Sequence, residues 1–171
     1  MVRVIERQFT MNPSLRRPEE ILAYRSLRQI LGVDPWSLWT VGPADSVLTA
    51  LRIMADKNIG FLVVAEQGAI AGVLSEHDCV RHVIVARKSL DTTPVADIMI
   101  RDVVTVELDR TFLDCLRLMH RHRIRHLPVV ANGKPVAVIS IRDLLSESVK
   151  HHEKIIDELE RERLNVFTSM A

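Results

Sequence analysis

Residues 123–143, RIRHLPVVANGKPVAVISIRD, repeat the pattern of residues 58–78, NIGFLVVAEQGAIAGVLSEHD. The match extends without a gap from residues 40–80 onto residues 105–145, at a constant shift of 65 positions, and thirteen of these 41 pairs are identical. Most identical pairs are apolar, so the repeat preserves a core, but the shared Ser and Asp of the two stretches are polar. A repeat that keeps core and polar residues together predicts two copies of one fold, each with the same polar site.

Each copy is expected to contain five elements in the order strand, helix, strand, strand, helix. An extended piece leads to a helix with apolar residues at helical spacing, and two short apolar strands joined by a turn lead to a second helix. The turns are Gln67-Gly68 and Asn132-Gly133, and Asn-Gly is the strongest short hairpin signal. In the first copy the strands are predicted at 39–41, 61–65 and 70–74, and the helices begin at 46 and 75. In the second copy the strands are predicted at 103–106, 127–130 and 135–139, and the helices begin at 111 and 140.

These elements predict an α/β (α+β) fold in which two tandem units pack through their sheets about a pseudo-twofold axis. A unit of about 55 residues buries little core alone, so the pairing of the two sheets supplies the rest. Pro128 cannot donate to a ladder, so we expect it at the start or edge of a strand. The predicted boundaries are an N-terminal extension over 1–35 with a helix at 18–31, a first repeat over 36–86, a polar linker over 87–94, a second repeat over 95–147, and a C-terminal helix and tail over 148–171.

The helix that begins at the second Ser is expected to continue to about residue 164. Its apolar positions make a narrow stripe with three- and four-residue steps between charged flanks, formed by Leu145, Val149, His152, Ile156 and Leu159. A mostly polar helix with one such stripe packs on a partner chain or across its own domain. The pattern favours neither.

The bulk composition is that of an ordinary globular protein. Of the 171 residues, 47% are hydrophobic and 26% are charged, and the net charge of +1 favours neither nucleic acid nor a membrane as partner. No apolar run approaches the roughly 18 residues of a membrane span, and charges interrupt the N-terminus where a signal peptide is apolar. Cys79 and Cys115 lie in apolar patterns without a Cys-x-x-Cys spacing, which indicates buried thiols in a reducing, cytoplasmic setting.

The two quoted stretches, with their strand–turn–strand pattern and paired Ser-x-x-Asp, resemble cystathionine-β-synthase (CBS) domains. The tandem pair looks like a Bateman module, and the likeness covers about residues 25–148. In detail the chain is similar to small, stand-alone bacterial CBS-pair proteins. The resemblance implies a regulatory module that forms a homodimer, with a tetramer as the alternative.

Ser75-x-x-Asp78 and Ser140-x-x-Asp143 each stand where a strand ends and a helix begins. Local sequence alone favours a capping box, in which the Ser binds the third amide and the acid reaches back. The functional alternative is a helix N-terminus that receives an anion, with the Asp accepting from both hydroxyls of a ribose. In CBS pairs that bind adenosine nucleotides this pattern is the ribose-phosphate signature, so the resemblance favours ligand binding.

The resemblance also places the adenine of each ligand against backbone close to the two extended pieces and the two first strands. For this chain those positions are Thr40, Val41, Ile59, Thr105, Val106 and Ile124. Two sites are therefore expected.

The run of residues 120–126 holds three arginines and three histidines. Arg123, Arg125 and Arg142 are the candidates for phosphate, because guanidinium groups pair oxygens bidentately. The first copy has Asn58, Gly60, Phe61 and His77 where the second has Arg123, Arg125, His126 and Arg142. The two sites are therefore not equivalent: one takes a more charged nucleotide, or one is empty.

We expect a cytoplasmic sensor that binds AMP, ADP or ATP first, with NAD(H) or S-adenosylmethionine as alternatives, and reports them to an unidentified regulated protein. No Gly-rich phosphate loop, activated nucleophile or metal cluster indicates an enzyme. The histidines lack accompanying acids or cysteines, so no metal is expected. A structural dimerisation domain with a vestigial site is a further alternative. Trp36 and Trp39 are either an aromatic platform or, as we favour, core or interface residues.

Overall fold

The computed structural model describes residues 24–32 and 38–169 of the chain. The described residues within 25–149 form one compact unit, and residues 150–169 belong to another. The predicted helix over 18–31 is wrong over residues 24–26: Tyr24 and Arg25 are not helical, and Ser26 is extended and caps a short helix, α2 (Leu27–Leu31), through a capping box with Gln29. Residues 18–23 lie outside the described part.

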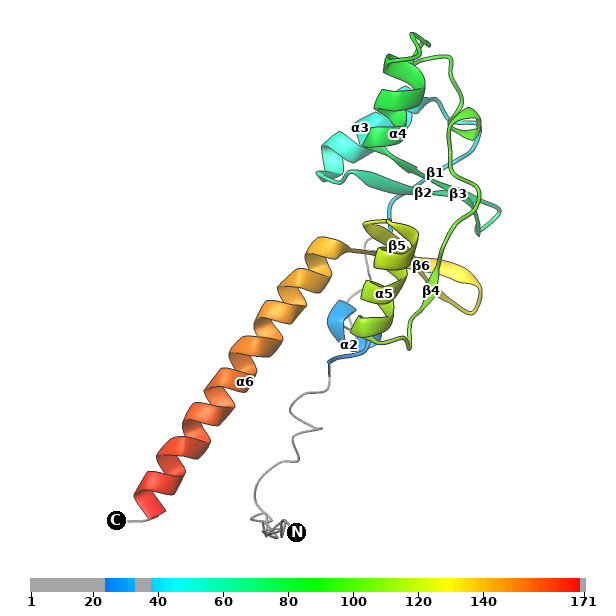
Figure 1. Cartoon of the computed structure of the whole chain (residues 1–171). Helices are drawn as coiled ribbons and strands as arrows, with labels where there is room; N and C mark the ends of the chain where they lie inside the picture. The colour runs from blue at the N-terminus through cyan, green and yellow to red at the C-terminus, as the bar shows by residue number, and fades with distance from the viewer. Residues whose placement is uncertain (1–23, 33–37, 170–171) are drawn as a thin grey trace, which may run out of the picture. The chain divides into compact units, whose positions relative to one another are not determined.

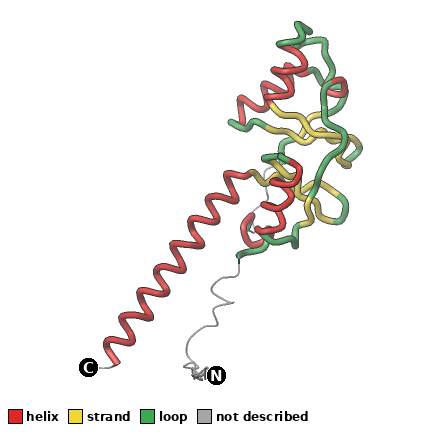
Figure 2. The backbone as a smooth tube through the Cα atoms, viewed as in Figure 1, coloured by secondary structure: helices red, strands yellow, loops and turns green. Residues whose placement is uncertain are grey.

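Both copies of the repeat fold in the predicted order of elements (Figures 1 and 2). The first copy contains β1 (Thr40–Val41), α3 (Val47–Lys57), β2 (Phe61–Glu66), β3 (Ala69–Ser75) and α4 (Glu76–Cys79), which continues as a π-helical segment, Val80–Ile84. A 3₁₀ turn, Val95–Asp97, precedes the second copy, which contains β4 (Val106–Glu107), α5 (Phe112–His122), β5 (His126–Ala131), β6 (Lys134–Ser140) and α6 (Ile141–Ser169).

The two sheets have the same topology and register. Their orders are β1-β2-β3 and β4-β5-β6, with the first pair of strands parallel and the second antiparallel in each. Phe61 pairs with Ser75 as His126 pairs with Ser140, and each sheet has a register shift at the matching place, after Val64 or after Val129. The sequence repeat is therefore a structural repeat down to its irregularities.

The sequence predicted Pro128 at the start or edge of a strand, and this prediction is wrong. Pro128 is the buried third residue of the central strand β5, opposite Val138. The matching residue of the first copy, Val63, pairs with Thr40 of β1, whereas β5 first pairs with β4 one residue later, at Val129. Because proline has no N–H to donate, a central strand accommodates it where the neighbouring parallel ladder has not yet begun.

Both core helices begin at a side-chain cap and end at a left-handed residue. Ser46 caps α3, and Thr111 forms a capping box with Asp114 at the start of α5. The helices end at Asn58 (φ 52°) and Arg123 (φ 54°). Asn adopts this conformation readily, whereas Arg pays about 1 kcal/mol or more for it.

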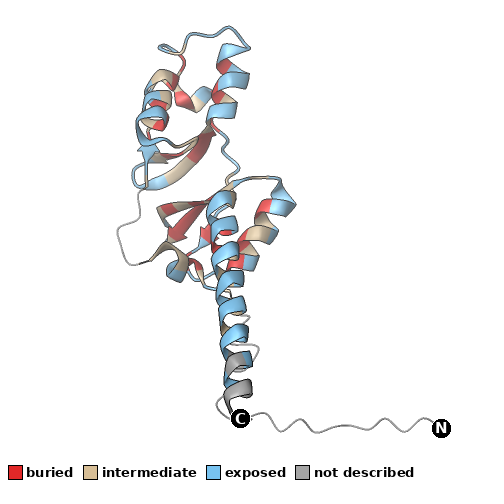
Figure 3. Ribbon diagram, turned by 90° about the vertical axis from the view of Figure 1, so that its left-hand side faces the viewer, coloured by how far each residue is buried: buried red, intermediate tan, exposed pale blue. Residues whose placement is uncertain are grey.

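The core of each copy lies between the sheet and its helices, where buried residues gather in Figure 3. In the first copy it contains Val41, Val47, Ala50, Met54, Leu62, Val64, Leu74, Cys79 and Val83, together with Val95, Ile98 and Met99 from the stretch before the second copy. The two sheets approach each other at β3 and β6. The predicted packing of the copies through their sheets is confirmed.

The stretch that precedes each copy binds to the other copy. Leu27 N–H donates to the Arg110 carbonyl at 3.0 Å and Arg28 N–H donates to the Leu108 carbonyl at 3.1 Å. Before the second copy, Val95 N–H donates to the Asp45 carbonyl at 2.8 Å and Ala96 N–H to the Pro43 carbonyl at 2.9 Å. Because Asp45 and Pro43 match Arg110 and Leu108 in the repeat, the two crossings are equivalent.

The segment 87–94, predicted as a polar linker, is fixed to the first copy. The carbonyls of Leu90 and Thr93 each accept a backbone hydrogen bond at 3.0 Å from the first turn of α3, and Thr93 is buried. These bonds satisfy N–H groups that a helix start leaves free.

No helix of the described residues is long and apolar enough to cross a membrane.

Candidate functional site

In each copy the start of the middle strand and the start of the second helix meet at one end of the sheet. The Gly60 carbonyl accepts a hydrogen bond from Glu76 N–H at 3.1 Å, and the Arg125 carbonyl accepts one from Ile141 N–H at 2.8 Å. Thr40 pairs with Val63, two residues along β2 from the Phe61–Ser75 pair. Of the predicted positions, Thr40 and Val41 form β1 and Val106 begins β4, Ser75 and Ser140 end β3 and β6, and Ile59, Thr105 and Ile124 lie just outside the strands.

Ser75 and Asp78 form a complete capping box. Ser75 N–H donates to Asp78 Oδ2 at 3.0 Å, the Ser75 hydroxyl donates to the same oxygen at 2.5 Å, and Asp78 N–H donates to Ser75 Oγ at 3.3 Å. Both residues are half-buried.

Ser140 and Asp143 repeat this arrangement at the start of α6, with the corresponding distances 2.8, 2.6 and 3.2 Å. Asp143 is exposed. The capping interpretation of both motifs is confirmed. In both carboxylates only Oδ2 takes part, and Oδ1 accepts no hydrogen bond from the described residues. Each cap therefore leaves one acceptor oxygen for another molecule.

Three arginines of the second copy lie close in sequence to the elements that meet at Ser140 and Asp143. Arg123 is the left-handed residue at the end of α5, Arg125 begins the approach to β5, and Arg142 follows the first residue of α6; all three are exposed. None of these three guanidinium groups forms an ion pair with another described residue. They are free to pair with anionic oxygens.

His126 and Phe61 form a contact that sequence reasoning missed. Their rings stack with centroids 4.7 Å apart and an interplanar angle of 13°. Burial lowers the pKa of His126 below its usual range, nearby Arg125 lowers that pKa further, and nearby Asp143 opposes both. The two residues hold the same position in the repeat. A pseudo-twofold axis brings equivalent residues near it together, so this identity of position was the available signal.

Trp39 belongs to the first copy and lies next to Thr40, one of the positions predicted for its site. It directly precedes β1, is 39% exposed, and carries the Lys57 ammonium 4.2 Å above its ring centroid, a cation–π contact. Trp39 is therefore not a core residue, which corrects that part of the prediction. Trp36 lies outside the described residues.

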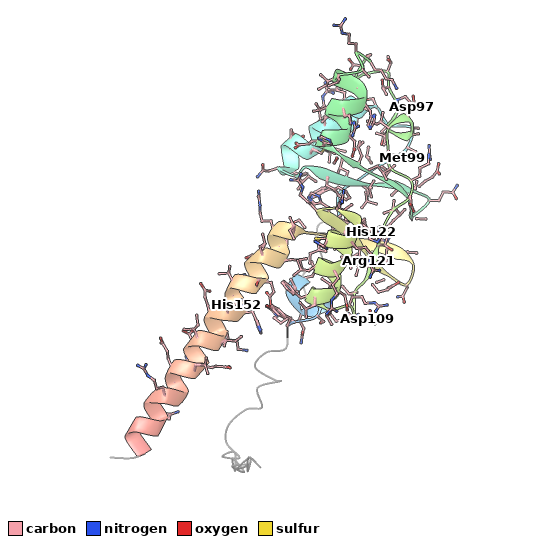
Figure 4. All side chains as sticks on the ribbon, in the orientation of Figure 1. Asp97, Met99, Asp109, Arg121, His122 and His152 are labelled. Atoms are coloured by element: carbon pink, nitrogen blue, oxygen red, sulfur yellow. The ribbon has the colours of Figure 1, made fainter. Side chains whose placement is uncertain are left out.

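The remaining candidates do not assemble into a site. No group of three or more His, Cys, Asp or Glu among the described residues is arranged to hold a metal ion. Arg121 and His122 stand exposed at the end of α5 (Figure 4). Cys79 and Cys115 are free and buried, and burial raises the pKa of each thiol to about 11, which keeps both protonated near neutral pH.

The fold and the repeated motif define a CBS-domain pair. The CBS domain family model matches residues 35–85 and again residues 95–150, so the chain belongs to the CBS-domain family. CBS pairs are regulatory modules that bind ligands.

The chain is 35% identical over 128 residues to the mitochondrial CBS domain-containing protein CBSX3 of Arabidopsis thaliana. The aligned region covers 72% of this chain and 60% of that protein. It spans only 22% of CBSCBSPB5 from the same plant, at 29% identity. Among solved structures, a putative signal-transduction protein with CBS domains from Burkholderia ambifaria matches at 36% identity and TM-score 0.70, over 74% of this chain and 95% of that one. The CBS pair of MJ0100, solved in complex with 5′-methylthioadenosine and S-adenosyl-L-methionine, shares the fold at 22% identity and TM-score 0.63, over 72% and 94% of the two chains.

Proposed function

We propose that this protein is a regulatory module that binds an adenosine-type ligand at each capped Ser–Asp pair. The observation that carries the proposal is the duplicated carboxylate that is held by a helix cap at the end of each sheet and whose Oδ1 accepts no hydrogen bond from the described residues. AMP, ADP and ATP are the first candidates, and NAD(H) and S-adenosylmethionine are alternatives for the same position. The two adenosine-containing ligands of MJ0100 support the choice of class.

The proposed binding mode follows from the donors and acceptors at each edge. Oδ1 of Asp78 or Asp143 accepts from a ribose hydroxyl, since an ionised carboxylate has two acceptor oxygens. The base lies against backbone near Thr40 and Val41, with Ile59 opposite, or at the matching Thr105, Val106 and Ile124. Phosphate oxygens pair with Arg123, Arg125 and Arg142 in the second copy.

We propose a change of assembly or conformation as the output, in a homodimer. Two apolar positions of the second helix are exposed in both copies: Val80 and Ile84 (46% and 53%) match Leu145 and Val149 (both 58%). Paired exposed apolar residues on equivalent helices favour a symmetric contact with a second copy of the chain. Ligand shifts this equilibrium by its differential affinity for the two states.

The test is a thermal-shift and calorimetric panel on nucleotide-stripped protein with AMP, ADP, ATP, NAD, NADH and S-adenosylmethionine. A ligand at about 100 times its Kd adds about 2.7 kcal/mol to the free energy of unfolding. Asp78→Ala and Asp143→Ala should each weaken binding at one site. The absence of a shift with every ligand would contradict the proposal and favour a structural dimerisation domain.

Asp114→Ala is the matched control. Asp114 makes the same capping box with Thr111, with distances of 3.2, 2.9 and 3.2 Å, but at the opposite end of α5 from Arg123. All three substitutions remove a cap and should each cost about 1 kcal/mol of stability. Only the two proposed site variants should also lose ligand affinity. Turnover of nucleotide by the purified protein would instead indicate an enzyme.

A further inference from the structure

The two sites differ in charge although their backbones are equivalent. At residues 57–61 and 75–78, Lys57 against Glu76 and Asp78 leaves a net charge of −1. At residues 122–126 and 140–143, three arginines against Asp143 leave a net charge of +2. Local charge of this kind sets the sign of the ligand that each site attracts.

The acidic side chain of the first site lies where the second site has a cation. A Cβ placed on Gly60 would lie 3.2 Å from Glu76 Oε2, so this carboxylate rests against the glycine. The matching residue of the second copy is Arg125, whose guanidinium is exposed and forms no ion pair with the described residues. A phosphate beside Gly60 would meet a carboxylate and be repelled, whereas beside Arg125 it would meet a donor fork.

The first site has an aromatic surface that the second lacks. Lys57 covers one face of Trp39, and the ring is still 39% exposed, so uncovered surface remains for another group. Trp39 immediately precedes Thr40, the first residue of β1, and Ser75 is the last residue of β3 in the same sheet. β1 and β3 are two strand spacings apart, which is roughly 10 Å. The second copy has Val104 in this place. A flat base stacks on indole with useful energy and needs no phosphate for it.

We propose that the two sites sort adenosine ligands by charge. The second site takes a phosphorylated nucleotide through its arginines, and the first takes a nucleoside without phosphate, neutral or cationic, whose base stacks on Trp39. This inference rests on the proposed function, because it assumes that both Asp residues hold ribose. It adds the ligand class of each site and the role of Trp39.

The experiment uses calorimetric titration of the full chain with three probes: ATP, adenosine and S-adenosylmethionine. Asp143→Ala should weaken ATP binding about tenfold or more and leave the other two probes unchanged, since one charge-assisted hydrogen bond is worth at least this factor. Asp78→Ala should do the reverse. In the Asp143→Ala background, Glu76→Gln should restore part of the ATP binding by removing the repelling carboxylate.

Trp39 fluorescence supplies a second readout that reports only on the first site. In a Trp36→Phe protein, adenosine and S-adenosylmethionine should change the Trp39 emission at saturation, and ATP should not. Trp39→Phe should retain most of the adenosine affinity, and Trp39→Ala should lose about tenfold. Asp114→Ala serves as the stability control in both readouts.

The outcomes separate this inference from the proposed function. If no probe binds the wild-type protein, the proposed function and the inference both fail. If probes bind but Asp78→Ala and Asp143→Ala weaken all three alike, or if ATP changes Trp39 emission as strongly as adenosine, charge sorting is overturned while the proposed function stands. A Trp39 signal that follows protein concentration rather than ligand would assign this ring to a protein interface and overturn its role as a platform.

Discussion

His126 and Phe61 show how one pair of side chains joins the two copies. Their stacked rings stand at equivalent positions, and the His ring is held where protonation is unfavourable, because burial and Arg125 lower its pKa more than Asp143 raises it. A proton on this ring would place a charge in the contact between the copies. It would also lie near the carboxylate proposed to hold ribose, so protonation and binding at the second site should be coupled.

The first prediction concerns pH. A His with a lowered folded-state pKa stabilises the fold fully above its unfolded pKa of about 6.5, and this contribution is lost as the pH falls through that value, because the unfolded chain then takes up the proton first. Urea midpoints between about pH 5.5 and pH 7.5 should therefore fall on acidification. His126→Phe keeps an aromatic pair and should flatten this dependence. Equal pH slopes for wild type and variant would exclude His126 as the responsible group.

At the scale of elements, β3 shows how the stretch before the second copy shapes its neighbour. Val73 and Ile100 exchange two backbone hydrogen bonds of 2.9 Å, which lay residues 99–100 across the strand at Gly72. A Cβ at Gly72 would lie 2.8 Å from Met99 Sδ and 2.9 Å from the Ile100 carbonyl oxygen. The second copy has Ala137 at this position; it is buried, and no isolated bridge joins its neighbour Val138 to another segment among the described residues.

We therefore expect that adding a methyl group at residue 72 destabilises the protein more than removing one at the matching residue 137. Gly72→Ala should destabilise the protein by about 1–3 kcal/mol, because backbone must move to admit the methyl group. Ala137→Gly, the matched control, should cost only about 0.5–1 kcal/mol from added flexibility. Chemical denaturation of both variants checks this expectation, and a Gly72→Ala variant as stable as wild type would show that the crossing segment is not fixed there.

The elements themselves were largely predictable, and their exceptions have physical reasons. The strands, turns and caps follow from local patterns that both copies carry, so each copy supported the reading of the other. Pro128 was misplaced because its tolerance depends on where β4 begins to pair, a tertiary fact. The crossing contacts were missed because Leu27 and Val95 are 68 positions apart, whereas the repeat has a shift of 65, so self-comparison did not align them.

The candidate site was predictable to a similar depth. The Ser-x-x-Asp pairs could be read as caps from local sequence and as ligand positions from resemblance, and the structure shows complete caps with one oxygen left over. The sequence alone could not show that Glu76 rests on Gly60 or that Lys57 covers Trp39, because these contacts join elements separated along the chain.

For the whole molecule, the exchanged crossings should make residues 25–149 unfold as one. Leu27 is fully buried although it precedes the first copy, and its N–H binds the second. Leu27→Ala should lower stability by about 2–5 kcal/mol through lost burial and a cavity. We expect a single transition that coincides by circular dichroism and Trp fluorescence. Two separated transitions would show that the copies are independent.

The assembly of whole molecules is tested by charge on the exposed apolar positions. Leu145→Glu should shift the protein toward monomer in light scattering after size exclusion, because a carboxylate would be buried without a partner at a symmetric contact. Leu113→Glu, at another exposed apolar position on α5 (41%), is the control and should leave the mass unchanged. An unchanged mass for Leu145→Glu would remove this helix face from the proposed interface.

The crossing of the two segments also fixes an order of events during synthesis. The first copy cannot complete its core until Val95, Ile98 and Met99 have left the ribosome, although its own strands and helices end at Ile84. Leu27 is made before its partners, so its amide must wait until residues 108–110 have been made. The apolar surface of the first copy therefore stays open until residues 95–99 have been made, and that around Leu27 until residues 108–110 have been made.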